Sequence, residues 1–160
     1  MKTFQTKNYT QGVDEIGAAF LDADFLAAKF EAMGSRNIEI TVEALDDDEF
    51  QVTIVREAPV DVPRALKSVV KPWNKIVQNE HWSGADGGPY RGEIELGTDG
   101  VPAELSSVIE IEQTGSGCSC TVTNEITCKI PLIGKKLAQF IAKEAEKTVD
   151  EEYEYISQNA

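Results

Sequence analysis

The pattern of hydrophobic and polar positions ends in one long amphipathic helix. From Pro131 to Gln158, apolar side chains recur at the spacing of a helix with one covered face and one wet face. The covered arc holds Leu137, Ala138, Ile141, Ala142, Ala145, Thr148, Val149, Tyr153 and Ile156. Alanine and threonine are small for core positions, and Glu152 falls within the same arc. This face therefore predicts either close packing on a sheet or an open space beneath the helix.

The beginning of the chain predicts one strand and two short helices. Residues 3–10 read as a short strand that ends at a turn. Apolar residues then recur at helical spacing over residues 13–20 and again over residues 25–33. Residues 21–23 form the break, where Asp22 or Asp24 can cap the second helix.

From residue 37 onward the apolar period changes to two, which is typical of strands with one buried face. Tight turns rich in Asp or Gly separate the strands. The alternation covers residues 37–44, 50–57, 75–83, 90–96, 103–111 and 118–130.

A segment from Val60 to Trp73 interrupts these strands. Pro63 suits the first position of a helix, and Leu66, Val69 and Val70 form a short apolar stripe. We therefore predict a short helical segment over one end of the sheet. The complete order is one strand, two short helices, six mostly antiparallel strands and one long helix, which is the pattern of an α+β fold.

Composition and charge restrict the class of partner. At 160 residues and 41% hydrophobic, the chain can bury one core, and we treat residues 1–160 as a single domain. A net charge of −13, spread along the chain, repels phosphate groups and anionic lipids. We expect no nucleic-acid partner and no stable membrane insertion. No apolar run is long enough to span a bilayer, and residues 1–20 lack the apolar region of a signal peptide, so we expect a cytoplasmic protein.

The three cysteines, Cys118, Cys120 and Cys128, have the same parity on the last predicted strand. Their odd number argues against a disulfide framework. A Cys-x-Cys pair supplies only two metal ligands, and no further ligands follow at the usual spacing. We therefore expect core cysteines, no metal site and no cofactor.

Four local patterns accompany this order of elements: Asp14 to Asp22, Arg56-Glu57-Ala58-Pro59, Glu80-His81-Trp82, and Ile130-Pro131-Leu132-Ile133-Gly134. With them the chain resembles, over essentially its whole length, a bacterial branch of the START, polyketide-cyclase and Bet v 1-like (SRPBCC) superfamily. The resemblance implies a helix-grip fold, a curved seven-stranded antiparallel sheet wrapped around a long C-terminal helix, with two short helices between strands 1 and 2. It also implies a cavity between sheet and helix for a lipid, a polyketide or a similar small hydrophobic molecule.

Inward polar residues are informative under this interpretation, because a buried polar group must be paired or must face a ligand. Strand parity points Arg56 inward. On residues 75–83 either the set with Glu80 and Trp82 or the set with His81 faces inward, and the apolar Ile76 and Trp82 favour the first. Arg56 and Glu80 would then compensate each other on adjacent strands, either as a structural ion pair at the mouth or as ligand contacts.

The predicted ligand-binding set combines these residues with the inward face of the last helix, and a gate lies on the segment before the fourth strand. The set is Arg56, Glu80, Trp82, Tyr90, Asn124, Leu137, Ile141, Ala145 and Thr148, and the gate is Val69, Val70 and Trp73.

Three functions fit this pattern. The first is binding or carriage of a small hydrophobic molecule. The second is a cyclase or dehydratase in which Arg56, Glu80 and Tyr90 polarise a carbonyl group and move a proton. His81 is the obvious general base for an enzyme, but its parity points outward. The third is an interaction protein whose own side chains fill the interior and whose acidic faces suit a basic partner. The sequence assigns no catalytic residue.

Overall fold

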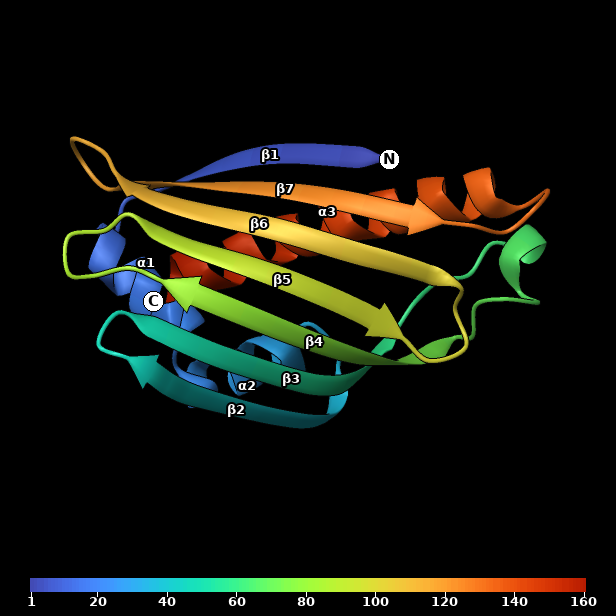
Figure 1. Ribbon diagram of the computed structural model, residues 1–160, viewed down its shortest axis with the longest axis horizontal. Coiled ribbons are helices and arrows are strands. Elements are labelled where there is room, and N and C mark those ends of the chain that lie inside the picture. Colours follow the sequence, from blue (N-terminus) through green and yellow to red (C-terminus); the bar gives the residue numbers. More distant parts are fainter.

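The computed structural model describes residues 1–160 as one curved antiparallel sheet with three α-helices and a short 3₁₀ helix (Figure 1). The strands are β1 (Lys2–Tyr9), β2 (Arg36–Asp46), β3 (Glu49–Pro59), β4 (Trp73–Ser83), β5 (Tyr90–Thr98), β6 (Ala103–Gln113) and β7 (Cys118–Cys128). The helices are α1 (Val13–Phe20), α2 (Ala23–Ala32), η1 (Arg64–Leu66) and α3 (Gly134–Asn159). The predicted helix-grip fold, with two short helices between the first two strands, is confirmed.

The strand order β1-β7-β6-β5-β4-β3-β2 places the first two strands of the chain at opposite edges of the seven-stranded sheet. The chain must therefore cross from one edge to the other between β1 and β2, and α1 and α2 make this crossing. The predicted break between them is confirmed, since the Asp22 Oδ1 atom accepts hydrogen bonds from the backbone N–H groups of Asp24 and Phe25 at 2.9 and 3.1 Å.

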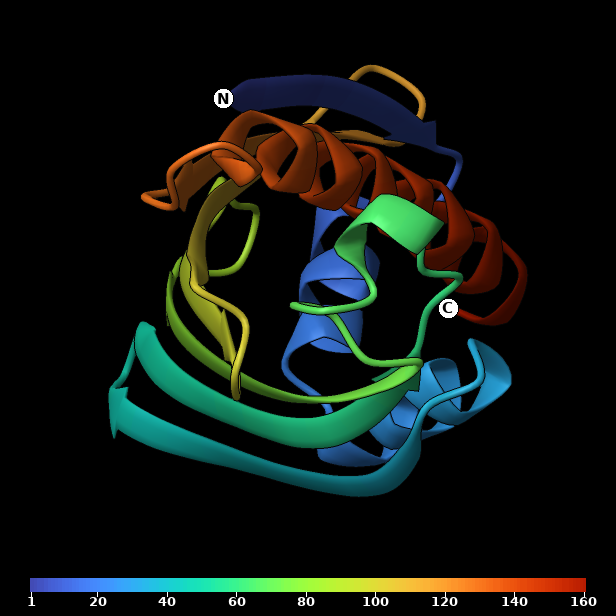
Figure 2. The ribbon, with the colours of Figure 1, turned by 90° about the vertical axis from the view of Figure 1, so that its right-hand side faces the viewer.

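The last helix lies on the concave side of the sheet, and Figure 2 shows the strands forming an arc around it. Its N-terminal half packs closely, because Ala138 and Ala142 form a cluster with Ile126 of β7. Its C-terminal half joins the main core through Ile156. No helix of the protein combines the length and the apolar character needed to cross a membrane.

Two predicted segments are shorter in the structure. The segment from Val60 to Trp73 contains only the single turn of η1, which begins after Pro63, because the β-branched Val69 and Val70 and then Pro72 disfavour its continuation. The last helix begins at Gly134 rather than at Pro131, and Leu132 has a left-handed φ of 71° just before it.

The interior of the fold contains the cysteines as predicted. Cys118 and Cys120 are buried in the main core, and Cys128 is half-buried; all three are free thiols. Burial raises the pKa of the Cys120 thiol to about 12, with the Glu152 carboxylate contributing in the same direction. These cysteines therefore act as small apolar core residues.

Candidate functional site

A cavity of about 350 Å³ lies between the concave face of the sheet and α3. The sheet side carries Ile94, Leu96, Ser107, Ile109, Val122 and Asn124, and Phe30 of α2 and Met33 just after it close one end. Of the 35 lining residues 19 are hydrophobic, and most of the others are polar or charged. This volume falls within the range of about 300–1,000 Å³ that is typical of small-molecule sites.

The roof of the cavity is the stretch of α3 that carries small residues. Ile141, Ala145 and Thr148 line the space, whereas Ala138 and Ala142 pack on β7. The helix face with small residues therefore packs closely on the sheet at Ala138 and Ala142 and leaves an open space at Ala145 and Thr148. The open part lies opposite Asn124 of β7, which also lines the cavity.

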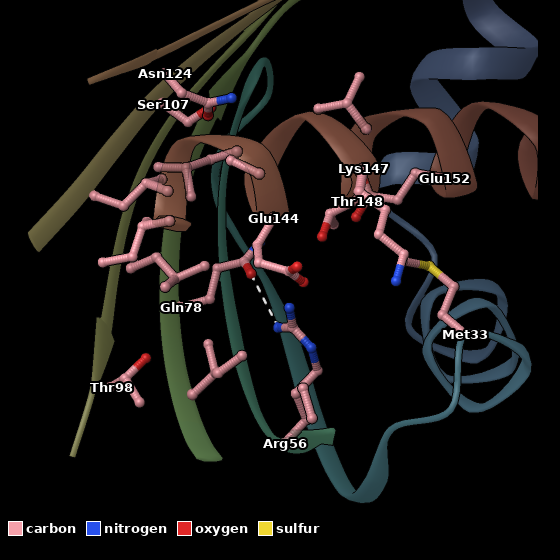
Figure 3. A pocket seen from close by; sticks show the side chains of 18 of the residues that line it. Met33, Arg56, Gln78, Thr98, Ser107, Asn124, Glu144, Lys147, Thr148 and Glu152 are labelled. Atoms are coloured by element: carbon pink, nitrogen blue, oxygen red, sulfur yellow. Dashed lines mark hydrogen bonds between the residues drawn. The ribbon is translucent and has the colours of Figure 1, made fainter. Parts of the chain in front are cut away.

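A chain of hydrogen bonds runs along the sheet wall from β3 to β4, and Figure 3 shows the first of them, between Arg56 and Gln78. The Arg56 Nη1 atom donates to Gln78 Oε1 at 3.1 Å, and Gln78 Nε2 donates to Glu80 Oε2. The indole Nε1 of Trp82 donates to Glu80 Oε1 at 2.7 Å. All four side chains are buried, so the predicted inward parity of both strands is confirmed.

The predicted direct pair of Arg56 with Glu80 does not form. In the register of β3 and β4, Arg56 lies opposite Ile76, and Glu80 lies opposite Val52. The backbone positions of Arg56 and Glu80 are therefore four residues apart along the paired strands. That offset corresponds to roughly 13 Å along the strands, which is too far for direct contact. The Gln78 amide lies between them and links the two charged groups instead.

Burial shifts the pKa values of Arg56 and Glu80, the two charged residues in this series of hydrogen bonds. It lowers the pKa of Arg56, an effect opposed by the carboxylates of Glu152 and Glu80. It raises the pKa of Glu80, an effect opposed by the hydrogen bonds from Trp82 and Gln78. Arginine stays protonated at any ordinary pH, so the sheet wall holds one permanent cation and one carboxyl group with a reduced tendency to ionise.

A second charged pair closes the end of the cavity and was not predicted from the sequence. Lys29 of α2 is 2% exposed, and its Nζ atom lies 3.3 Å from Glu152 Oε1 of α3. The same Nζ atom lies 4.5 Å from the ring centroid of Phe30. A signal existed in the sequence, because Lys29 follows Leu26 by three residues and precedes Met33 by four, on the covered face of its helix.

We expect the substitution Lys29→Met to lower the free energy of unfolding by about 2 kcal/mol. Removing one partner of a buried pair leaves the other charge uncompensated, and water that reaches Glu152 through the cavity moderates the cost. Equilibrium urea unfolding measures the change. The exposed Lys143→Met on α3 is the matched control and should change stability by less than about 0.5 kcal/mol. Equal midpoints for the two variants would show that the pair between α2 and α3 does not stabilise the fold.

Asn124 borders the cavity, but its amide is already used by neighbouring strands. Ser107 Oγ donates to Asn124 Oδ1 at 2.7 Å, and Asn124 Nδ2 donates to Thr3 Oγ1 at 3.1 Å. These bonds connect β1, β6 and β7 across the sheet. Asn124 therefore contributes mainly to the shape of this wall.

Three residues of the predicted ligand-binding set lie away from the cavity. Tyr90 packs over Gly17 of α1, and its hydroxyl group donates to Asp14 Oδ1 at 2.8 Å. Trp82 is 1% exposed and lies against Phe20, with ring centroids 5.1 Å apart. Leu137 packs in a separate cluster with Leu66 and Val70. The reason is common to all three: other elements, α1 or the segment around η1, fill the two ends of the concave face.

Of the three predicted gate residues, only one lines the cavity. Val70 lines the cavity. Val69 does not line it and packs against the cluster of Leu66, Val70 and Leu137. Trp73 is exposed, and the guanidinium group of Arg36 stacks 3.7 Å from its ring centroid. His81 points outward as predicted, with Nε2 3.9 Å from Glu49 Oε2.

The geometry predicted for a cyclase or dehydratase is therefore absent. Arg56 and Glu80 line the cavity and Tyr90 does not. Burial and the hydrogen bond to Asp14 raise the pKa of Tyr90 to about 12, which makes it a poor proton donor at neutral pH. The two oxygens of Glu80 already accept hydrogen bonds from Gln78 and Trp82.

Comparison with protein families gives one match. The model of the family described as "Protein of unknown function (DUF2505)" matches residues 5–158. Among curated proteins, none matches this chain.

Comparison with solved structures gives matches over the whole chain. The protein TTHA0849 from Thermus thermophilus is 12% identical with a TM-score of 0.62, covering 99% of this chain and 95% of that one. Mll3558 from Rhizobium loti is 11% identical with a TM-score of 0.63, covering 100% and 96%. Ara h 8.0201 is 14% identical with a TM-score of 0.58, covering 99% of both chains. These identities are low, so the likeness is one of fold, and the fold is of the Bet v 1-like type.

Proposed function

The chain belongs to the DUF2505 family, and we propose that it binds and carries one small, largely apolar molecule between its sheet and α3. The observation that carries this proposal is the open cavity beneath Ala145 and Thr148. A sequence that needed only a packed core would place larger side chains at these two positions.

The lining supports a largely apolar ligand. Aliphatic side chains from β5, β6 and β7 line the sheet side of the cavity around the polar pair Ser107 and Asn124. Exposed lining residues, among them Pro59, Lys147 and Glu151, lie where the cavity meets solvent, between the end of β3 and α3. The resemblance of the sequence to the START, polyketide-cyclase and Bet v 1-like superfamily supports the same function, because that resemblance implies a ligand cavity in this place.

The other two functions have less support. The cyclase or dehydratase reaction lacks the convergence of Arg56, Glu80 and Tyr90 that it requires. An interaction protein with a filled interior does not need a cavity of about 350 Å³. Carriage of a ligand requires only the cavity and a path to it.

Two measurements on freshly purified protein test the proposal. Native mass spectrometry should detect a bound small molecule, and titration with the neutral apolar dye Nile red should give a saturable rise in fluorescence at one dye per chain. Nile red carries no acidic group, so its binding does not depend on a contact with a charged head group. The absence of both a bound mass and a saturable fluorescence change would exclude the proposed function.

A further inference from the structure

The guanidinium group of Arg56 is a buried cation with unused hydrogen-bond donors. The residue is 6% exposed, and Figure 3 shows its side chain projecting from β3 into the cavity. Of the five N–H donors of an arginine, only one, on Nη1, has a partner, the Gln78 Oε1 atom. The buried Nε atom has no hydrogen-bond partner, and Nη2 donates to no protein atom. Buried donors without acceptors are costly and are rarely left unmatched.

The charges around Arg56 leave it without a direct counter-ion. Glu80 is separated from it by the Gln78 amide, and burial favours the neutral form of Glu80. Glu152 pairs with Lys29 at 3.3 Å. The Arg56 Cζ atom and the Lys29 Nζ atom lie 4.2 and 4.5 Å from the ring centroid of Phe30, so two cations share one aromatic ring. Of these two cations, only Lys29 has a carboxylate within 4.0 Å.

The free edge of the guanidinium group defines the shape of its missing acceptor. The bond from Nη1 to Gln78 directs one edge of the group toward β4, and the edge formed by Nε and Nη2 has no acceptor in the protein. Two parallel N–H donors in a rigid fork match the two oxygens of a carboxylate. An acceptor bound there would place the rest of its molecule along the apolar wall of the cavity.

We propose that the ligand is an apolar monocarboxylic acid, such as a medium-chain fatty acid, whose carboxylate binds the Nε–Nη2 edge of Arg56. This inference rests on the proposed function and adds the chemical class of the ligand to it. Glu144 of α3 also lines the cavity and is half-buried. Its carboxyl group competes with an acid ligand, because like charges in one cavity repel each other.

The test compares decanoic acid with its methyl ester as competitors of Nile red at neutral pH. The two molecules have the same chain and differ in the charge of the head group. We expect the acid to displace the dye at a concentration at least about ten-fold lower than the ester, as a bidentate charge-assisted contact provides. This comparison needs only the unchanged protein and does not depend on the folding of a variant.

Two substitutions should move the preference for the acid in opposite directions. Arg56→Met should bring the acid-to-ester preference close to one, and Glu144→Gln should increase it. Arg56→Lys, which keeps the charge and loses the planar fork, should lie between Arg56→Met and the unchanged protein. A variant that failed to fold would lose the dye and both competitors together, which distinguishes misfolding from a lost head-group contact.

The outcomes separate this inference from the proposed function. Displacement by acid and ester at equal concentrations would overturn the assignment of a carboxylate and would leave carriage of an apolar molecule in place. Failure of Nile red and of both competitors to bind would overturn the two together. A preference for the acid that survived Arg56→Met would overturn the role of Arg56.

Discussion

Gly92→Ala is expected to lower the free energy of unfolding by about 3 kcal/mol. Gly92 of β5 lies directly opposite Trp82 of β4, and an added Cβ atom would lie 2.6 Å from the Cε2 and Cζ2 atoms of the indole ring. Trp82 is 1% exposed and stacks on Phe20, so its ring has no free space into which to move. Overpacking of this kind costs about 1–3 kcal/mol. A displaced indole would also lose its hydrogen bond to Glu80.

Gly97→Ala is the matched control for this prediction. Gly97 lies on the same strand, and an added Cβ atom there meets no atom within 4 Å. Its substitution should change the free energy of unfolding by no more than about 0.5 kcal/mol. Urea unfolding followed by circular dichroism compares the two variants. If Gly92→Ala unfolded at the same urea concentration as Gly97→Ala, the proposed close packing of the Trp82 ring against Gly92 would be wrong.

The alternation of side chains made the sheet and the inward face predictable. Side chains of a strand point to opposite faces in turn, so one apolar residue fixes the direction of every neighbour. Ile76 and Trp82 were sufficient to place Glu80 inside, and Ile54 placed Arg56 inside. The helix break at residues 21–23 was predictable for a similar reason, since the capping aspartate acts on its immediate neighbours.

The extent of the cavity was not predictable from parity. Tyr90, Trp82 and Leu137 share the inward direction of the cavity residues, yet they lie beneath α1 or beside η1. Which part of a concave face stays open depends on how far these other elements reach across it. The alternation also does not give the register of β3 against β4. This register places Gln78 between Arg56 and Glu80.

Lys29 shows the opposite case, in which a usable signal was present. A lysine at helical spacing from Leu26 and Met33 must pair its ammonium group in the interior or extend it to water. Glu152 in the apolar arc of the last helix is the complementary signal, and the structure brings the two residues together. Two isolated charges on two covered helix faces thus predict a contact between these helices, a rule that needs no knowledge of the fold.

Ala145→Phe is expected to weaken binding of Nile red and of decanoic acid by at least about a hundred-fold, or ~2.7 kcal/mol. Ala145 lines the open part of the roof, and a phenyl ring at this position would occupy space that the ligand requires. The same ring would fill part of an empty interior, so the free energy of unfolding should stay constant or rise. Binding and stability are therefore expected to change in opposite directions.

This opposition is what distinguishes a ligand cavity from a tightly packed core. In a packed core the phenyl ring would be overpacked and would destabilise the protein by about 1–3 kcal/mol. Glu154→Phe is the matched control, because residue 154 of α3 is exposed and does not line the cavity. A loss of stability in Ala145→Phe, or an equal loss of binding in both variants, would contradict the open space beneath the helix. Lost binding with retained stability in Ala145→Phe alone would identify that space as the site where the ligand is held.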